Sequence, residues 1–335
     1  MKPTTLSVHI SHFLNHYLAG QRNLSPNTIK AYRDVFVLLL RFCRDVKGIA
    51  VEKLELDQIN AQLVGDFLDH LEQERHCSIR TLNQRLAVLH AFFRYLQVEE
   101  PALLLECQRI LGIPLRRFVR QEVGYLTKDL LTALLAQPDL ERPDGRRDAV
   151  LLSVLYDTGA RVQELIDLTA GDVRLEAPAQ VRILGKGRKV RVVPLMDNTA
   201  RLLQRYFDEN DLALPENYDR PLFRNKHGNQ LTRVGVNYIL QKHLQKVREA
   251  CPYFKQKVSP HTLRHTKAMH LVQGGVSLDI VRDFLGHVDI KTTELYARAN
   301  LEMRRAAIEK VSPAPAPDVP SWKENKSLLE WLQRL

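Results

Sequence analysis

The sequence has little cysteine, no long apolar run and no surplus of acidic residues, and each absence excludes a class of protein. Only 4 of the 335 residues are cysteine and none form a CxxC pair, which excludes a disulfide-stapled secreted scaffold. No stretch approaches the roughly 20 apolar residues of a membrane-spanning helix. The first residues also lack the apolar core of a signal peptide. We therefore expect a cytoplasmic protein with no membrane partner.

What the sequence does have is length and positive charge. At about 150 residues per domain, its length predicts two domains. Lys and Arg number 49 against 39 Asp and Glu, which gives a formal charge of +10, and 44% hydrophobic residues are typical of a globular chain. A positive excess favours a polyanionic partner, most simply nucleic acid, although charge alone does not identify one.

Residues 1–100 carry helical periodicity throughout. Ser25-Pro26 is a typical helix start, with an N-cap serine and a proline in the first turn. Apolar residues then recur at helical spacing, and no strand-like alternation interrupts them. We expect an N-terminal bundle of about four helices, the core DNA-binding domain of the chain if nucleic acid is its partner. A basic, extended interdomain linker over 101–124 should follow it.

Residues 125–312 indicate a second domain that mixes helices with strands. Polar and apolar side chains alternate over 181–184 and 190–193, and the sequence GKGR at 185–188 separates the two runs as a hairpin turn. The whole chain should therefore be mainly α with a small antiparallel β-sheet, an α+β fold. Residues 313–335 begin with alternating Pro and Ala, which predicts a linker before a short C-terminal helix that docks in cis or, as an arm, in trans.

Five short polar motifs follow one another in this second domain. They are TGAR at 158–161, GKGRK at 185–189, HTLRH at 261–265, LGH at 285–287 and TTELYA at 292–297. Taken singly, each has an ordinary interpretation: a solvated arginine, a basic turn, a capped helix or a packed tyrosine. Within HTLRH, His261 and Arg264 are three residues apart and share a helical face, so together they could hold one phosphate.

A zinc site is the rival interpretation of the histidines. His261 and His265 are four residues apart, as in zinc-binding helices. Such helices carry Glu beside the first histidine, whereas this sequence has Thr262, and no CxxC pair supports a zinc site. We therefore expect no metal ligands and no cofactor.

In their order and combination, the five motifs resemble the tyrosine recombinases, also called the phage integrase family, in the layout of Xer-type and integrase-type bacterial members. The resemblance covers the second domain in order and extends less specifically to the first. It implies a SAM-like core-binding domain followed by a tyrosine-recombinase catalytic domain. The activity implied is site-specific recombination, in which DNA is cut and rejoined through a 3′-phosphotyrosyl intermediate without a metal.

The resemblance also assigns a role to six positions. The implied catalytic residues are Arg161, Lys186, His261, Arg264, His287 and Tyr296, of which Tyr296 is the nucleophile. Lys186 would act as general acid, and the remaining four would bind the phosphate. Glu164 is expected to buttress the helix that bears Arg161.

Family membership implies partners as well. These are double-stranded DNA with a specific core site, a homo-tetramer on two synapsed duplexes and accessory proteins, in a bacterial protein associated with the nucleoid. A mobile-element recombinase is favoured over a phage integrase or a chromosome-dimer resolvase. The basic residues expected to contact DNA are Arg80, Arg85, Arg94, Arg116, Arg117, Arg182, Arg188 and Lys189.

Three alternatives remain open at this point. A type IB topoisomerase shares the tyrosine chemistry but only nicks and reseals one strand. A non-catalytic DNA-binding protein on the same fold would share the charge, although six intact catalytic positions argue against it. A metal-dependent nuclease would need a carboxylate cluster near the histidines, and the sequence has none there.

Overall fold

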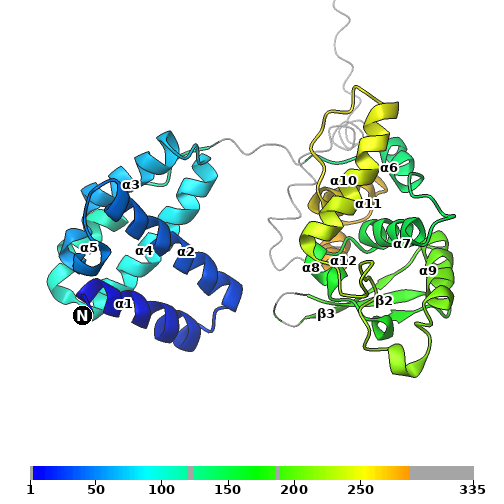
Figure 1. Cartoon of the computed structure of the whole chain (residues 1–335), viewed down its shortest axis with the longest axis horizontal. Coiled ribbons are helices and arrows are strands. Elements are labelled where there is room, and N and C mark those ends of the chain that lie inside the picture. The colour runs from blue at the N-terminus through cyan, green and yellow to red at the C-terminus, as the bar shows by residue number, and fades with distance from the viewer. Residues whose placement is uncertain (1–2, 119–123, 186, 188, 287–335) are drawn as a thin grey trace, which may run out of the picture. The chain divides into compact units, whose positions relative to one another are not determined.

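The chain divides into two compact units, Met1–Arg120 and Gln121–Leu335 (Figure 1). The computed structural model describes residues 3–118, 124–185, 187 and 189–286. The predicted features that lie outside the described residues are therefore Lys186, Arg188, His287, Tyr296 and the expected C-terminal helix. Among the described residues, no helix combines the length and apolar character needed to cross a membrane.

The first unit is a helical bundle with its own hydrophobic core. Its helices are α1 (Thr5–His12), which continues into a π-helical stretch (Phe13–Gln21), α2 (Pro26–Asp45), α3 (Ala61–Gln73), α4 (Ile79–Glu99) and α5 (Leu104–Leu111), with 3-10 turns at Val51–Lys53, Leu56–Gln58 and Pro101–Leu103. The predicted start of α2 is confirmed, because the Ser25 side chain accepts a hydrogen bond from the backbone of Thr28 and proline occupies the first turn.

The sequence predicts an extended linker over residues 101–124, but the structure is not extended over the whole of this segment. Its first half contains α5, whose Cys107 and Ile110 are buried in the core of the bundle. Glu106 of the same helix accepts a hydrogen bond from the backbone N–H of Ala61 at 2.7 Å, which satisfies a free donor in the first turn of α3. Contacts with distant elements therefore make this short segment helical.

Beyond α5 the chain stays attached to the bundle through Arg116. The backbone N–H and carbonyl of Arg116 bond to the side chain of Asn83 at 2.9 and 2.7 Å. Its guanidinium pairs with Asp69 at 2.6 Å and with Glu72. We call these three charged side chains the Arg116 cluster. The guanidinium of Arg116, a predicted DNA contact, is thus already engaged by two carboxylates.

The second unit combines helices with a three-stranded antiparallel sheet, so the predicted fold class is confirmed. Its elements are α6 (Lys128–Leu135), α7 (Pro143–Thr158), α8 (Val162–Ile166), β1 (Val173–Arg174), β2 (Gln180–Leu184), β3 (Val190–Pro194), α9 (Asp197–Glu209), α10 (Arg233–Ala250), α11 (Pro260–Gln273) and α12 (Leu278–Leu285), with 3-10 turns at Ala170–Asp172 and Pro215–Asn217. The strands follow the order β1-β2-β3, and Leu184 pairs with Val190 where the hairpin closes.

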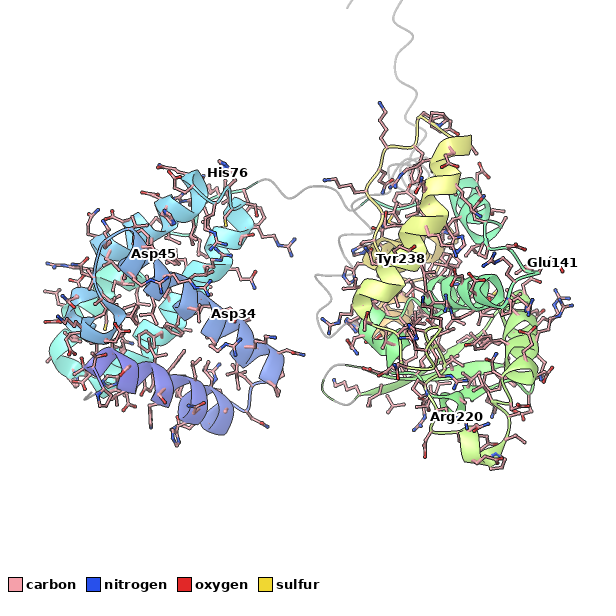
Figure 2. The ribbon with its side chains drawn as sticks, viewed as in Figure 1. Asp34, Asp45, His76, Glu141, Arg220 and Tyr238 are labelled. Carbon is pink, nitrogen blue, oxygen red and sulfur yellow. The ribbon has the colours of Figure 1, made fainter. Side chains whose placement is uncertain are left out.

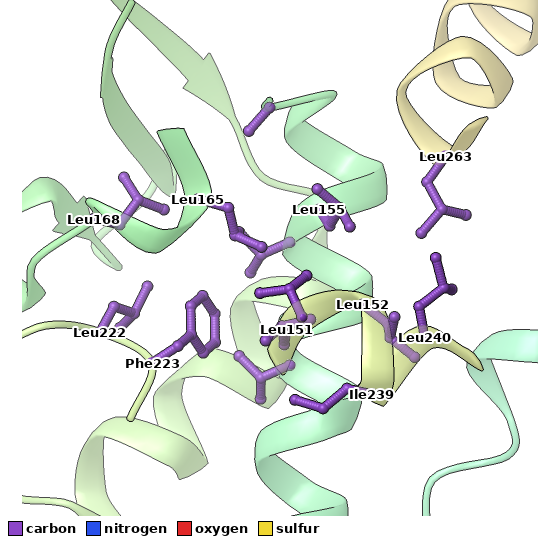
Figure 3. Packing of buried hydrophobic residues seen from close by; sticks show 14 of the residues in the cluster. Leu151, Leu152, Leu155, Leu165, Leu168, Leu222, Phe223, Ile239, Leu240 and Leu263 are labelled. Atoms are coloured by element: carbon purple, nitrogen blue, oxygen red, sulfur yellow. The ribbon is translucent and has the colours of Figure 1, made fainter. Parts of the chain in front are cut away.

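Helix α7 lies at the centre of this unit. Leu151, Leu152 and Leu155 are fully buried along it, and side chains from α8, α10 and α11 pack around them, including Leu263 (Figure 3). The helix ends at Gly159, whose φ of 56° is a left-handed conformation that favours glycine. The buried helix therefore fixes the point from which the chain enters the TGAR motif.

Candidate active site

Arg161 stands at the start of α8, directly after the turn that ends α7. The Glu164 carboxylate accepts two hydrogen bonds from it, one from the backbone N–H at 2.9 Å and one from Nη1 of the guanidinium at 2.6 Å. The expected contact between these two residues is thus present. The Arg161 side chain remains 34% exposed, so part of its guanidinium is accessible to a ligand.

Glu164 is also bound by a second arginine. Arg191 of β3 donates from Nη2 to Oε2 of Glu164 at 2.7 Å, and the Glu164 side chain is only 7% exposed. Burial alone would raise the pKa of Glu164, but hydrogen bonds from Arg191 and Arg161 reverse this effect and the pKa is lowered. The carboxylate is therefore ionised at neutral pH. We call these three side chains, one anion and two cations, the Glu164 cluster.

Arg264 joins two distant segments of the unit from a buried position. Its side chain is 1% exposed, and its Nη1 and Nη2 donate to the backbone carbonyls of Gly159 and Leu285 at 2.5 and 2.6 Å. Gly159 is two residues before Arg161, and Leu285 is two residues before His287. Arg264 thus ties the TGAR and LGH motifs to the helix that carries HTLRH.

The first two turns of α11 carry the two histidines of HTLRH. Ser259 caps the helix by accepting from the backbone of Thr262, and the rings of His261 and His265 meet edge to face with centroids 4.9 Å apart. Desolvation, Arg264 and Arg161 lower the pKa of His261. Desolvation, His261 and Arg264 lower that of His265 to about 4. Both rings are therefore neutral at pH 7.

Arg161, His261 and Arg264 are brought together by these contacts. Both arginines lower the pKa of His261, so their positive charges act on its ring. The described residues contain no group of three or more His, Cys, Asp or Glu side chains arranged to hold a metal ion. The arrangement is a compact cationic site with one neutral imidazole, which suits a phosphodiester.

Sequence reasoning missed a buried pair beneath this site. The Lys267 ammonium lies 3.7 Å from the Asp157 carboxylate and 4.8 Å from the centroid of the Tyr156 ring. Burial lowers the pKa of Lys267 and raises that of Tyr156 to about 12. The Tyr156 hydroxyl also bonds to Nδ1 of His270 at 2.8 Å. Only the apolar neighbours of these residues on α7 and α11 indicate, from sequence, that they are buried.

Two of the three predicted DNA contacts on α4 line grooves of the first unit. Arg85 lines a groove of about 600 Å³ between α2 and α4, together with Thr28, Gln84 and Asp34, the last of which is labelled in Figure 2. Arg94 lines a second groove of about 260 Å³. Exposed side chains on this unit also include Arg80 and Arg117.

Two predicted contacts lie on the hairpin side of the second unit. Arg182 is 63% exposed but pairs with Asp172 at 2.9 Å, and Lys189 is exposed. Arg191 belongs to the same basic run in the sequence, yet it is turned inward to Glu164. The basic run therefore does not form a single phosphate-facing surface.

Comparison with known proteins identifies the chain. Residues 124–303 match the phage integrase family, and residues 10–100 match the phage integrase N-terminal SAM-like domain. The chain belongs to the phage integrase family. The predicted SAM-like and catalytic domains are both confirmed by these two matches.

Individual relatives agree with this assignment. A putative integrase/recombinase, y4rC, of Sinorhizobium fredii is 38% identical over 93% of this chain and 93% of its own. The tyrosine recombinase XerC of Pelotomaculum thermopropionicum is 31% identical over 91% and 98%. A structure of the Tn1549 transposon integrase with circular intermediate DNA shares the fold, with a TM-score of 0.68 at 19% identity over 92% and 100%. The chain is accordingly a site-specific tyrosine recombinase, an enzyme of DNA strand transfer.

Proposed function

We propose that six residues perform the strand transfer at one site: Arg161, Lys186, His261, Arg264, His287 and Tyr296. The observation that carries this proposal is the pair of hydrogen bonds from Arg264 to Gly159 and Leu285. These bonds draw together three of the motifs that bear the six residues.

Cleavage begins with the Tyr296 hydroxyl. Its oxygen forms a bond to the phosphorus of the scissile phosphodiester, and the bond from phosphorus to the 5′-oxygen breaks. The phenol proton passes to the neutral ring of His261, and Lys186 gives a proton to the departing 5′-oxygen. The products are a 3′-phosphotyrosyl link and a free 5′-hydroxyl. Attack of a 5′-hydroxyl on that link reverses these steps and rejoins DNA without a further energy source.

The arginines stabilise the charge that develops during this step. The two non-bridging oxygens share one negative charge and gain more in the transition state, and Arg161 and Arg264 offer guanidinium donors to them. His287 adds a further donor. Because Glu164 is neutralised by a second arginine, the positive charge of Arg161 remains available to the phosphate.

The finer partner assignments follow the same reasoning. We propose that the duplex contains a specific core site, that Arg85 and Arg94 contact its phosphates from the α4 grooves, and that the exposed Arg80 contacts them from the same helix. Recombination of two duplexes requires four cleavages, which four copies of this one-nucleophile chain supply as a homo-tetramer. Relatives named as an integrase/recombinase and a transposon integrase favour a mobile element as the source of the site.

Covalent trapping tests the proposal and identifies the DNA. Wild-type protein and the Tyr296→Phe variant are expressed in cells, denatured rapidly, and the DNA attached to each is sequenced. We expect adducts from the wild type and none from Tyr296→Phe. Tyr238→Phe is the matched control, because this tyrosine is 70% exposed on α10 (Figure 2). Equal adducts from Tyr296→Phe would remove that residue from the role of nucleophile.

A second assay separates recombination from simple nicking and resealing. Two differently labelled duplexes that carry the recovered site are incubated together with the full chain. Exchange of label between them is expected of a recombinase. Relaxation of a supercoiled plasmid without such exchange would instead favour the topoisomerase-like alternative.

A further inference from the structure

Arg191 is the side chain through which separate parts of the site contact one another. It lies on β3 opposite Ile183 of β2, and its side chain is 11% exposed. Its Nη2 donates to Oε2 of Glu164, the same oxygen that accepts from the backbone of Arg161. Arg191 thus holds in place the carboxylate that holds Arg161.

Two glycines make room for this guanidinium. A Cβ atom on Gly185 would lie 3.4 Å from Nη1 of Arg191, and one on Gly286 would lie 3.2 Å from it. Gly286 also has a φ of +65°, so a side chain there would be strained as well as crowded. In the sequence Gly185 directly precedes Lys186, and Gly286 directly precedes His287. One guanidinium therefore lies against the backbone that leads into two of the proposed catalytic positions.

Arg191 also changes the net charge beside Arg161. A lone carboxylate would cancel the charge of Arg161, whereas the Glu164 cluster has two cations and one anion and keeps one positive charge. A fixed positive charge in a partly desolvated site favours the growing negative charge of a reacting phosphate. The Nε atom of Arg191 is buried and has no hydrogen-bond partner among the described residues, so the bond to Glu164 is what orients the guanidinium.

We propose that Arg191 is a positioning residue for DNA strand cleavage. It fixes the Arg161 guanidinium through Glu164. It also fixes the backbone that precedes Lys186 and His287. This inference rests on the proposed function, because Arg191 itself is assigned no contact with DNA.

The test measures the rate of covalent-complex formation by the full chain under single-turnover conditions. The probes are the duplex recovered by trapping with the wild type and the same duplex with a methylphosphonate at the cleaved position, where a methyl group replaces one charged oxygen. We expect Arg191→Gln to slow cleavage of the phosphate duplex about 100-fold. Cleavage of the methylphosphonate duplex should slow much less, because its transition state has less negative charge to stabilise. Arg191→Lys keeps the positive charge but loses the planar guanidinium. Its cleavage rate should lie between those of the wild type and Arg191→Gln.

A matched control comes from the same sheet. Arg174→Gln removes an exposed arginine from β1, and the variant should cleave both duplexes at the wild-type rate. Urea unfolding of every variant shows whether a slower rate reflects a smaller folded fraction. If Arg191→Gln does not fold, the comparison is made with Arg191→Lys.

The outcomes are distinct. A rate within threefold of wild type on the phosphate duplex, or equal slowing on both duplexes, would overturn the positioning role. Tyr296→Phe is assayed in parallel, and a covalent complex from that variant would overturn the proposed function. The two failures can thus be told apart.

Discussion

Each unit of the chain contains a cluster of three charged side chains, and the two clusters are opposite in composition. The Arg116 cluster has one arginine between two carboxylates and a net charge of −1. The Glu164 cluster has one carboxylate between two arginines and a net charge of +1. The first ties a chain segment to a bundle, whereas the second leaves positive charge where we propose that a phosphate binds.

Exposure separates the clusters as clearly as charge does. The side chain at the centre of the Arg116 cluster is 35% exposed, whereas that of Glu164 is 7% exposed. Exposed ion pairs contribute at most about 1 kcal/mol, because water screens them. Removal of one partner from a buried pair costs far more, since the other charge is left without compensation. The comparison therefore predicts unequal responses to equivalent substitutions.

The largest effect is expected from Glu164→Gln. The substitution leaves two arginines facing each other in a buried site, and the free energy of unfolding should fall by about 3 kcal/mol. Glu72→Gln is the matched change in the Arg116 cluster and should cost less than about 1 kcal/mol. Hydrogen exchange of amides in α8 and in α3 reports the two units separately. Equal losses would mean that burial does not distinguish the clusters.

The next effect concerns how the stability of the second unit, which contains the Glu164 cluster, depends on pH. The folded-state pKa of His265 is about 4, below its usual 6.5, so the unfolded chain binds the proton more readily. Stability from this group is complete above pH 6.5 and is lost as the pH falls toward 4, by up to about 3 kcal/mol.

The measurement is urea unfolding between pH 7.5 and 4.5. His265→Gln should flatten the decline in the free energy of unfolding across that range. His227→Gln replaces an exposed histidine of the same unit and should leave the decline unchanged. An identical decline in His265→Gln would show that other groups cause the acid sensitivity.

The smallest effect concerns the segment that the Arg116 cluster secures. Asn83→Ala removes two hydrogen bonds to the backbone of Arg116 and should cost about 1 kcal/mol. Exchange of the Arg116 amide should accelerate by roughly tenfold while amides of α2 keep their protection. Unchanged exchange at this amide would show that the ion pairs alone hold the segment.

Local chemistry made much of the fold predictable. The start of α2 could be located because the side chain of the N-cap Ser25 accepts a hydrogen bond from a backbone N–H in the first turn, and the structure shows the same arrangement at Ser78 and Thr127. The hairpin of β2 and β3 followed from alternation and a glycine-containing turn. Helix α5 could not be recognised in this way, because distant contacts of Cys107 and Glu106 stabilise it.

The motifs of the proposed catalytic site could be recognised in the sequence by their order, but the orientation of Arg191 could not. Alternation shows which residues of a strand share a face, and it does not show which face is buried. Val190 and Val192 are 54% and 55% exposed, whereas Arg191 shares the inner face with Val193. Hydrophobicity alone would have placed the valines inside. The decisive contact, with Glu164, joins positions 27 residues apart.

The two hydrogen bonds of Arg264 have a consequence for the order of events during synthesis. Their acceptors lie 105 residues before it and 21 residues after it in the chain. A nascent chain that has not yet released α12 from the ribosome lacks the second acceptor, so that bond forms only after the residues up to Leu285 have been synthesised. Arg264 therefore reaches both of its backbone partners only late in the synthesis of the second unit.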